Sequence, residues 1–70
     1  MSKPVTEIEE KVLDFIDYSI DVLGFPPTRA EIARNFGWRS PNAANDALLS
    51  LERKGRVRLI PAIARGVILT

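Results

Sequence analysis

The stretch PPTRAEIARNFGWRSPNAAN, residues 26–45, carries two helix-start signals close together. In the first, Thr28 and Glu31 have the spacing of a capping box, and the two prolines before them keep a helix from entering from upstream. Gly37 follows the next apolar residues, at a position where a left-handed residue can end a helix. These signals predict a short helix over residues 29–36.

The second helix-start signal follows directly after this glycine. Ser40 is a favourable N-cap, and Pro41 occupies the first helical position, where its missing N–H costs nothing. Gly55 is the next glycine, and the basic pair before it suits the negative end of a helix dipole. The sequence therefore predicts a helix over residues 41–54, and two short helices joined this tightly predict a helix-turn-helix.

The predicted 41–54 helix has an apolar side and a polar side at 100° per residue. Its inward positions are Ala44, Ala47, Leu48 and Leu51. Its outward positions are Asn42, Asn45, Asp46, Leu49 and Arg53. Asparagine can pair with adenine and aspartate can accept from the cytosine amino group, so this outward face is a candidate for reading base edges in the major groove of DNA. An ordinary solvated helix surface explains the same amides equally well.

The composition limits the classes of function. Seventy residues make one small domain with a marginal core. Because the chain has no cysteine and no histidine, it lacks disulfides, thiolate metal sites, the commonest general base and the commonest metal ligand. We therefore expect no enzyme activity, no cofactor and no metal. Frequent charges and an N-terminus without an apolar core predict a soluble intracellular protein with no membrane partner.

The net charge of +1 hides an uneven distribution. Up to Gly24 there are six acids and two lysines, a balance of −4, and from Phe25 onward there are eight bases and three acids, a balance of +5. Clustered basic side chains attract a polyanion, so the second half is the expected DNA-facing half. Surface arginines are common, and the charge split alone only suggests nucleic acid.

The first half predicts one amphipathic helix over residues 7–23. Thr6 and Glu9 have capping-box spacing, and Gly24 ends the pattern. The apolar stripe expected to face the core consists of Ile8, Val12, Phe15, Ile16, Ile20 and Leu23.

The last segment, residues 56–69, predicts a β-hairpin. A turn-like segment at 61–66 separates two short runs in which apolar residues alternate with others. The alternating apolar residues are Val57 and Leu59 before the turn and Val67 and Leu69 after it. Three helices followed by a hairpin make a mainly α fold with a small β-hairpin, the three-helix winged helix-turn-helix, and we expect this one domain to span residues 1–70.

Three apolar residues have no evident place in these stripes. Trp38, in the turn between the two short helices, fits a plug for the core better than a platform for a stacked base. Leu49 and Ile63 are expected to be exposed, and single exposed apolar residues are common.

Several motifs occur together in a fixed order: PPTRAEIA, RSPNAA, the RKG at the end of the 41–54 helix, and a terminal RG followed by aliphatic residues. In these motifs, and over nearly its whole length, the chain resembles the DNA-binding domain of LexA repressors. The resemblance implies a bacterial winged helix-turn-helix that represses genes of the DNA-damage (SOS) response. It also implies a double-stranded operator that is an inverted repeat, and a cytoplasmic protein associated with the nucleoid.

The resemblance, together with the placement of the remaining polar and basic residues around the two short helices, indicates which residues contact DNA. The residues expected to read bases are Asn42, Ala43, Asn45 and Asp46. The residues expected to contact the DNA backbone are Thr28, Arg29, Arg39, Ser40, Arg53, Lys54 and Arg65. Asn45 and Asp46 depart from the family pattern, because the best-known members carry glutamate at both positions.

Family members normally continue into a second domain, which dimerises and carries a serine and lysine pair for self-cleavage. That domain is absent from the seventy residues, so we expect no peptidase activity, and a homodimer only when the chain is joined to a dimerisation domain. The alternative is a winged-helix module for protein contacts, for which the exposed Leu49 is the best argument. Salt-dependent DNA binding distinguishes the two hypotheses.

Overall fold

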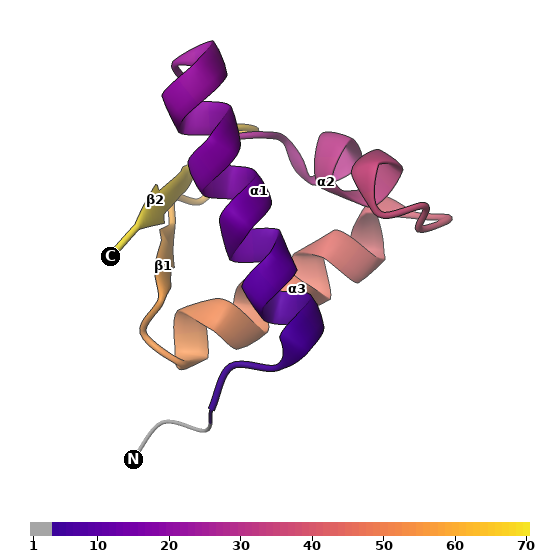
Figure 1. The fold of residues 1–70 in the computed structure, drawn as a ribbon, viewed down its shortest axis with the longest axis vertical. Coiled ribbons are helices and arrows are strands. Elements are labelled where there is room, and N and C mark those ends of the chain that lie inside the picture. The colour runs from indigo at the N-terminus through magenta and orange to yellow at the C-terminus, as the bar shows by residue number, and fades with distance from the viewer. Residues whose placement is uncertain (1–3) are drawn as a thin grey trace.

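The computed structural model describes residues 4–70 as three helices followed by a two-stranded antiparallel sheet (Figure 1). The elements are α1 (Glu7–Leu23), α2 (Arg29–Asn35), α3 (Pro41–Arg53), β1 (Val57–Leu59) and β2 (Val67–Leu69). This architecture confirms the predicted winged helix-turn-helix. The first three residues of the predicted domain lie outside the described part. No helix within residues 4–70 is long and apolar enough to cross a membrane.

Each helix begins at the side chain that caps it. The Thr6 hydroxyl accepts from the Glu9 N–H while the Glu9 carboxylate accepts from the Thr6 N–H, and Thr28 and Glu31 repeat this capping box at α2. The Ser40 hydroxyl caps α3. Capping oxygens satisfy N–H groups that a helix start leaves without partners, so these local signals fix where each helix begins.

The helices α2 and α3 each end one residue before the predicted position. Phe36 and Lys54 are C-cap residues with ψ close to 0°, which takes them out of the helix. Each is followed by a left-handed glycine, Gly37 with φ +70° and Gly55 with φ +75°. The chain thus leaves the helical conformation one residue before the glycine that reverses its direction.

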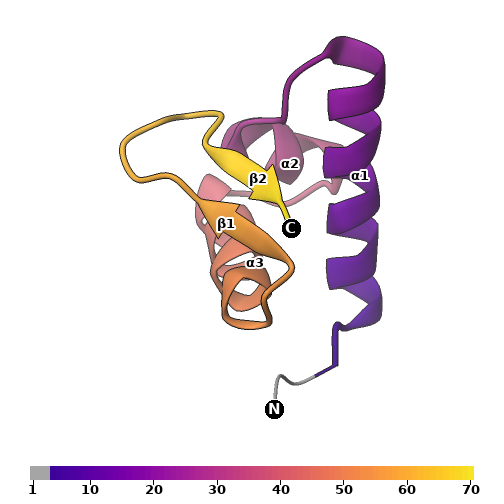
Figure 2. The same cartoon turned by 90° about the vertical axis from the view of Figure 1, so that its left-hand side faces the viewer.

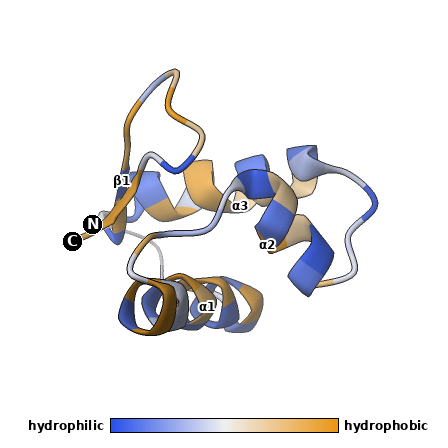
Figure 3. Cartoon of the chain, turned by 90° about the horizontal axis from the view of Figure 1, so that it is seen from above, coloured by the Kyte–Doolittle hydropathy of each residue, from blue (hydrophilic) through white to orange (hydrophobic). Residues whose placement is uncertain are grey.

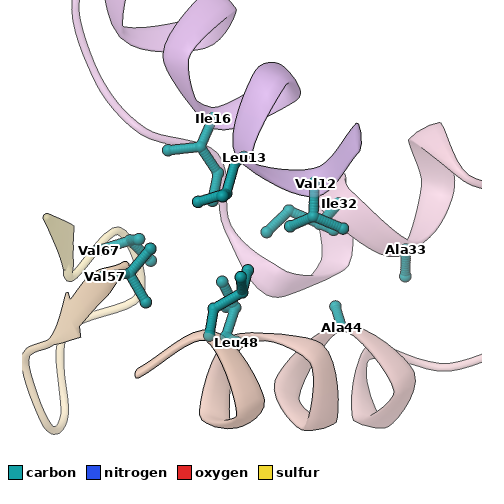
Figure 4. Packing of buried hydrophobic residues seen from close by; sticks show 10 residues of the cluster. Val12, Leu13, Ile16, Ile32, Ala33, Ala44, Leu48, Val57 and Val67 are labelled. Carbon is teal, nitrogen blue, oxygen red and sulfur yellow. The ribbon is translucent and has the colours of Figure 1, made fainter. Parts of the chain in front are cut away.

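The core lies where α1 packs against α2, α3 and the hairpin (Figure 4). All five elements contribute buried side chains, which are Val12, Leu13, Ile16, Ile32, Ala33, Ala44, Leu48, Leu51, Val57 and Val67. The inward side predicted for α3 is buried apart from Ala47, which is half-buried. Since α3 uses this whole side for the core, its opposite side remains free for a ligand.

The stripe predicted for α1 is wrong at its two ends. Ile8 is 45% exposed and Leu23 is 58% exposed, whereas Leu13 is buried. The C-terminal end of α1 extends past the other elements (Figure 1), and Leu23, the last residue of the helix, lies outside the buried core. At the other end Glu9, and not Ile8, shares the buried helix face of Leu13 and Ile16, and its carboxylate pairs there with Lys54.

The hairpin packs one face on the core and turns the other to solvent. Val57 and Val67 are buried, whereas Arg58 and Ile68, the middle residues of the two strands, are exposed. The connecting loop, residues 60–66, extends away from α1 (Figure 2) and is largely apolar (Figure 3). A Cβ on Gly66 would lie 2.7 Å from the Ile60 carbonyl oxygen, so only glycine allows this close approach at the base of the loop.

Candidate nucleic-acid interface

The residues predicted to read bases lie together at the start of α3, on the side opposite the core. Asn42, Ala43 and Asp46 are exposed, and Asn45 is half-buried. The intervening Ala44 is fully buried, which fixes the rotation of the helix and directs its neighbours outward. The first turn and a half of α3 therefore presents two amides, a carboxylate and a methyl group on one accessible surface.

Two arginines lie at the two ends of α3. Arg39 lies in the turn before α3 and Arg53 in its last turn, and both are exposed. Neither guanidinium group makes a hydrogen bond or an ion pair with residues 4–70. The backbone N–H of Asn42 donates to the Ser40 hydroxyl at 3.0 Å, so the cap already satisfies this N–H of the first turn of α3.

Arg29 connects α2 to the same surface. Its Nε donates a hydrogen bond of 2.7 Å to Oδ1 of Asn45, and both side chains are half-buried. Arg29 is the first residue of α2, directly after the half-buried N-cap Thr28. A residue predicted to contact the DNA backbone therefore contacts a residue predicted to read a base.

Lys54 is directed inward. Its ammonium group forms an ion pair with the Glu9 carboxylate at the start of α1, and the two side chains are only 12% and 7% exposed. Burial raises the pKa of Glu9, but hydrogen bonds from Lys54, Ser50 and Thr6 outweigh it and lower this pKa to about 2. The pair joins the start of α1 to the end of α3.

Arg65 is held at the base of the hairpin. Its guanidinium donates to both Glu31 oxygens, at 2.6 and 3.0 Å, and to the Pro26 carbonyl at 2.9 Å. It also lies 4.5 Å from the centre of the Phe25 ring. The hydrogen bonds from Arg65, followed by that from the Thr28 N–H, lower the pKa of Glu31 to about 2. Arg65 therefore joins the hairpin to the capping box of α2.

Trp38 is part of the core periphery, as predicted. Its ring stacks on Phe36 with 5.1 Å between centroids, and Phe36 meets Phe15 edge-on at 6.1 Å. All three rings are half-buried and pack against the core. The aromatic row closes the space between α1 and the helix-turn-helix, which confirms the plug and not the stacking platform.

A capped α2, a tight turn and an exposed polar face on α3 are the parts of a DNA-reading helix-turn-helix. The family model of the LexA DNA binding domain matches residues 2–66. The chain belongs to this family. Over 67 residues, covering 96% of this chain, it is 48% identical to the LexA repressor of Bordetella petrii. It is 49% identical to that of Vibrio parahaemolyticus and 46% identical to that of Actinobacillus succinogenes, each over 65 residues and 93% of this chain. The chain spans only 30%, 32% and 31% of the length of these three relatives, in the same order.

Sequence reasoning missed three polar contacts of this LexA-type domain. The pairs Arg29 with Asn45, Arg65 with Glu31, and Lys54 with Glu9 are separated by 16, 34 and 45 positions. No helical or strand periodicity relates positions so far apart, so no local pattern could indicate them. Glu9 is the one acid of the first turn of α1 that is buried, which would have indicated a partner. The sequence does not show which of the three acids of that turn is buried.

Proposed function

We propose that the chain binds double-stranded DNA in a sequence-specific manner, with α3 in the major groove. The observation that carries this proposal is the exposed start of α3. Asn42, Asn45 and Asp46 offer hydrogen-bonding groups of the kinds that read base edges, and the Ala43 methyl suits contact with a thymine methyl. The N-terminal part of a recognition helix is the part that reaches bases.

We propose that the DNA backbone passes both ends of α3. Arg39 and Ser40 would contact phosphates at the N-terminal end and Arg53 at the other, with Thr28 and Arg29 nearby. The structure pairs Lys54 and Arg65 with carboxylates of the same domain, so we assign these two a stabilising role. Two charged phosphate contacts correspond to a slope of about −2 in log K against log salt.

We propose further that the domain is the DNA-reading part of a LexA-like transcriptional repressor of bacterial DNA-damage response genes. Its operator would then be an inverted repeat, bound by two copies that a separate dimerisation domain holds together. One domain alone would bind a half-site weakly, because most of the affinity of such an operator comes from engaging two linked domains. The family membership and the identity to LexA repressors support this proposal.

Selection of binding sites from random duplex DNA tests the proposal. The chain is used alone and fused to a short dimerising coiled coil. A single selected half-site, present as an inverted repeat for the fused chain, is the expected result. The salt dependence is then measured by fluorescence anisotropy on the selected duplex and on a scrambled duplex of equal length. Equal affinity for the two duplexes contradicts specific recognition, and the absence of any salt-dependent binding favours a protein-contact module using exposed Leu49.

A further inference from the structure

The hydrogen bond between Arg29 and Asn45 constrains how Asn45 can be used. Asn45 is the fifth residue of α3, at the edge of its exposed polar face, and Arg29 is the first residue of α2. A guanidinium group has only donors, so the atom of the Asn45 amide that faces Arg29 must be the carbonyl oxygen. The orientation of the amide is thus fixed by chemistry, in a contact of 2.7 Å with a charged donor.

The other end of the amide remains available. The Nδ2 group of Asn45 makes no hydrogen bond to residues 4–70, and within that range no buried side-chain nitrogen or oxygen lacks a partner. The half-buried Asn45 therefore keeps its NH₂ group in contact with solvent. The oxygen of this amide is thus engaged by a charged donor of the same domain, whereas its NH₂ group is not engaged by any group within residues 4–70.

We infer that Arg29 is a positioning residue for sequence recognition, which restricts Asn45 to donating hydrogen bonds to a base. This inference rests on the proposed DNA-binding function. An unrestrained asparagine reads adenine with its oxygen and its NH₂ group together, but here the oxygen already accepts a hydrogen bond from Arg29 of α2. A donor suits guanine, with its two acceptors, the N7 atom of adenine, or the O4 atom of thymine. Cytosine presents only an amino donor in the major groove, and Asn45 therefore selects against it.

Substitution of each partner separates this role from a phosphate contact by Arg29. In Arg29→Met the amide can rotate and offer its oxygen to the cytosine amino group. We expect discrimination against cytosine at one base pair of the half-site to fall by roughly tenfold, with the rest of the selected motif and the salt slope unchanged. A phosphate contact predicts the opposite pattern, namely an unchanged motif, weaker binding to all sequences and a slope smaller by about 1.

Asn45→Asp provides the second variant. The aspartate keeps an acceptor for Arg29 but has no donor, so the preference at the same base pair should change to cytosine. Arg34→Met is the matched control, because Arg34 is an exposed arginine of the same helix. It should select the wild-type motif. Circular dichroism and a melting curve for every variant show whether each is folded at the temperature of the selection.

The selection is read as base frequencies at every position and checked by anisotropy on duplexes that differ at one base pair. If the wild-type chain selects no motif, the proposed function itself fails. If it selects a motif that Arg29→Met reproduces at every position, the inference about Arg29 is overturned while DNA binding stands, whatever Asn45→Asp selects. A uniform loss of affinity with a reduced salt slope in Arg29→Met also overturns it.

Discussion

Replacing Lys54 with methionine removes the ammonium group that neutralises the buried carboxylate of Glu9. The aliphatic stem is nearly preserved, so the change isolates the charge. Removing one partner of a buried ion pair typically costs about 3–5 kcal/mol, because the other charge is left in a poorly solvated place. A domain of this size has a total stability of roughly 4–10 kcal/mol. Lys54→Met should therefore remove a large share of the free energy of unfolding.

A double-mutant cycle measures the pair directly. Glu9→Gln keeps an acceptor for the Thr6 N–H, so it preserves the capping box while removing the charge. We expect the double variant Glu9→Gln with Lys54→Met to be more stable than Lys54→Met alone, because no buried charge remains. Urea unfolding followed by Trp38 fluorescence and by circular dichroism gives the four free energies. Lys11→Met, an exposed lysine of α1, is the control and should change stability by less than about 0.5 kcal/mol.

The pH dependence supplies a second readout with a definite sign. The pKa of Glu9 is lowered from 4.5 to about 2 in the folded protein, so its contribution to stability is present above pH 4.5 and is lost as the pH falls toward 2. Lys54→Met lacks the ammonium that lowers this pKa. The stability gap between the wild type and Lys54→Met should therefore narrow between pH 5 and pH 2. Additive costs in the cycle, together with a gap that does not change with pH, would refute the buried pair.

Four further predictions concern the interface and the hairpin. Arg65→Ala should lower the melting temperature but leave the salt slope of DNA binding unchanged, because the Arg65 guanidinium is already paired with Glu31. A slope smaller by about 1 would instead make Arg65 a phosphate contact. Arg39→Ala should weaken binding to all sequences alike and reduce the salt slope by about 1, and retention of the full slope would remove Arg39 from the interface. Asn42→Ala should weaken binding to the selected half-site by roughly 1–3 kcal/mol and relax selectivity at one base pair, as measured by anisotropy on duplexes that differ at one base pair. Equal losses on all duplexes would assign Asn42 to a backbone contact. Gly66→Ala should destabilise the hairpin, because the alanine Cβ would lie 2.7 Å from the Ile60 carbonyl oxygen. A melting temperature equal to that of the wild type would contradict this geometry.

The sequence alone was sufficient for the order of the elements and for the face that α3 presents. Helix starts depend on interactions within three or four residues, and both capping boxes are complete within that span. The rotation of α3 follows from the spacing of Ala44, Leu48 and Leu51, since all three had to be buried in so small a core. The accessible positions of Asn42 and Asp46 were therefore predictable, as was the winged helix-turn-helix class.

The tertiary structure decided which polar groups are free to meet a ligand. From the sequence, Lys54 and Arg65 were two basic residues near the expected DNA, but each is bound to a carboxylate on a distant element. Glu9 is buried and Ile8 exposed because α1 directs the face of Glu9, Leu13 and Ile16 toward the core, where Lys54 pairs with the Glu9 carboxylate. The Arg29 contact to Asn45 likewise depends on how closely α2 approaches α3. Such choices belong to the tertiary structure, because burial and long-range pairing depend on the distance between elements, which local sequence patterns do not encode.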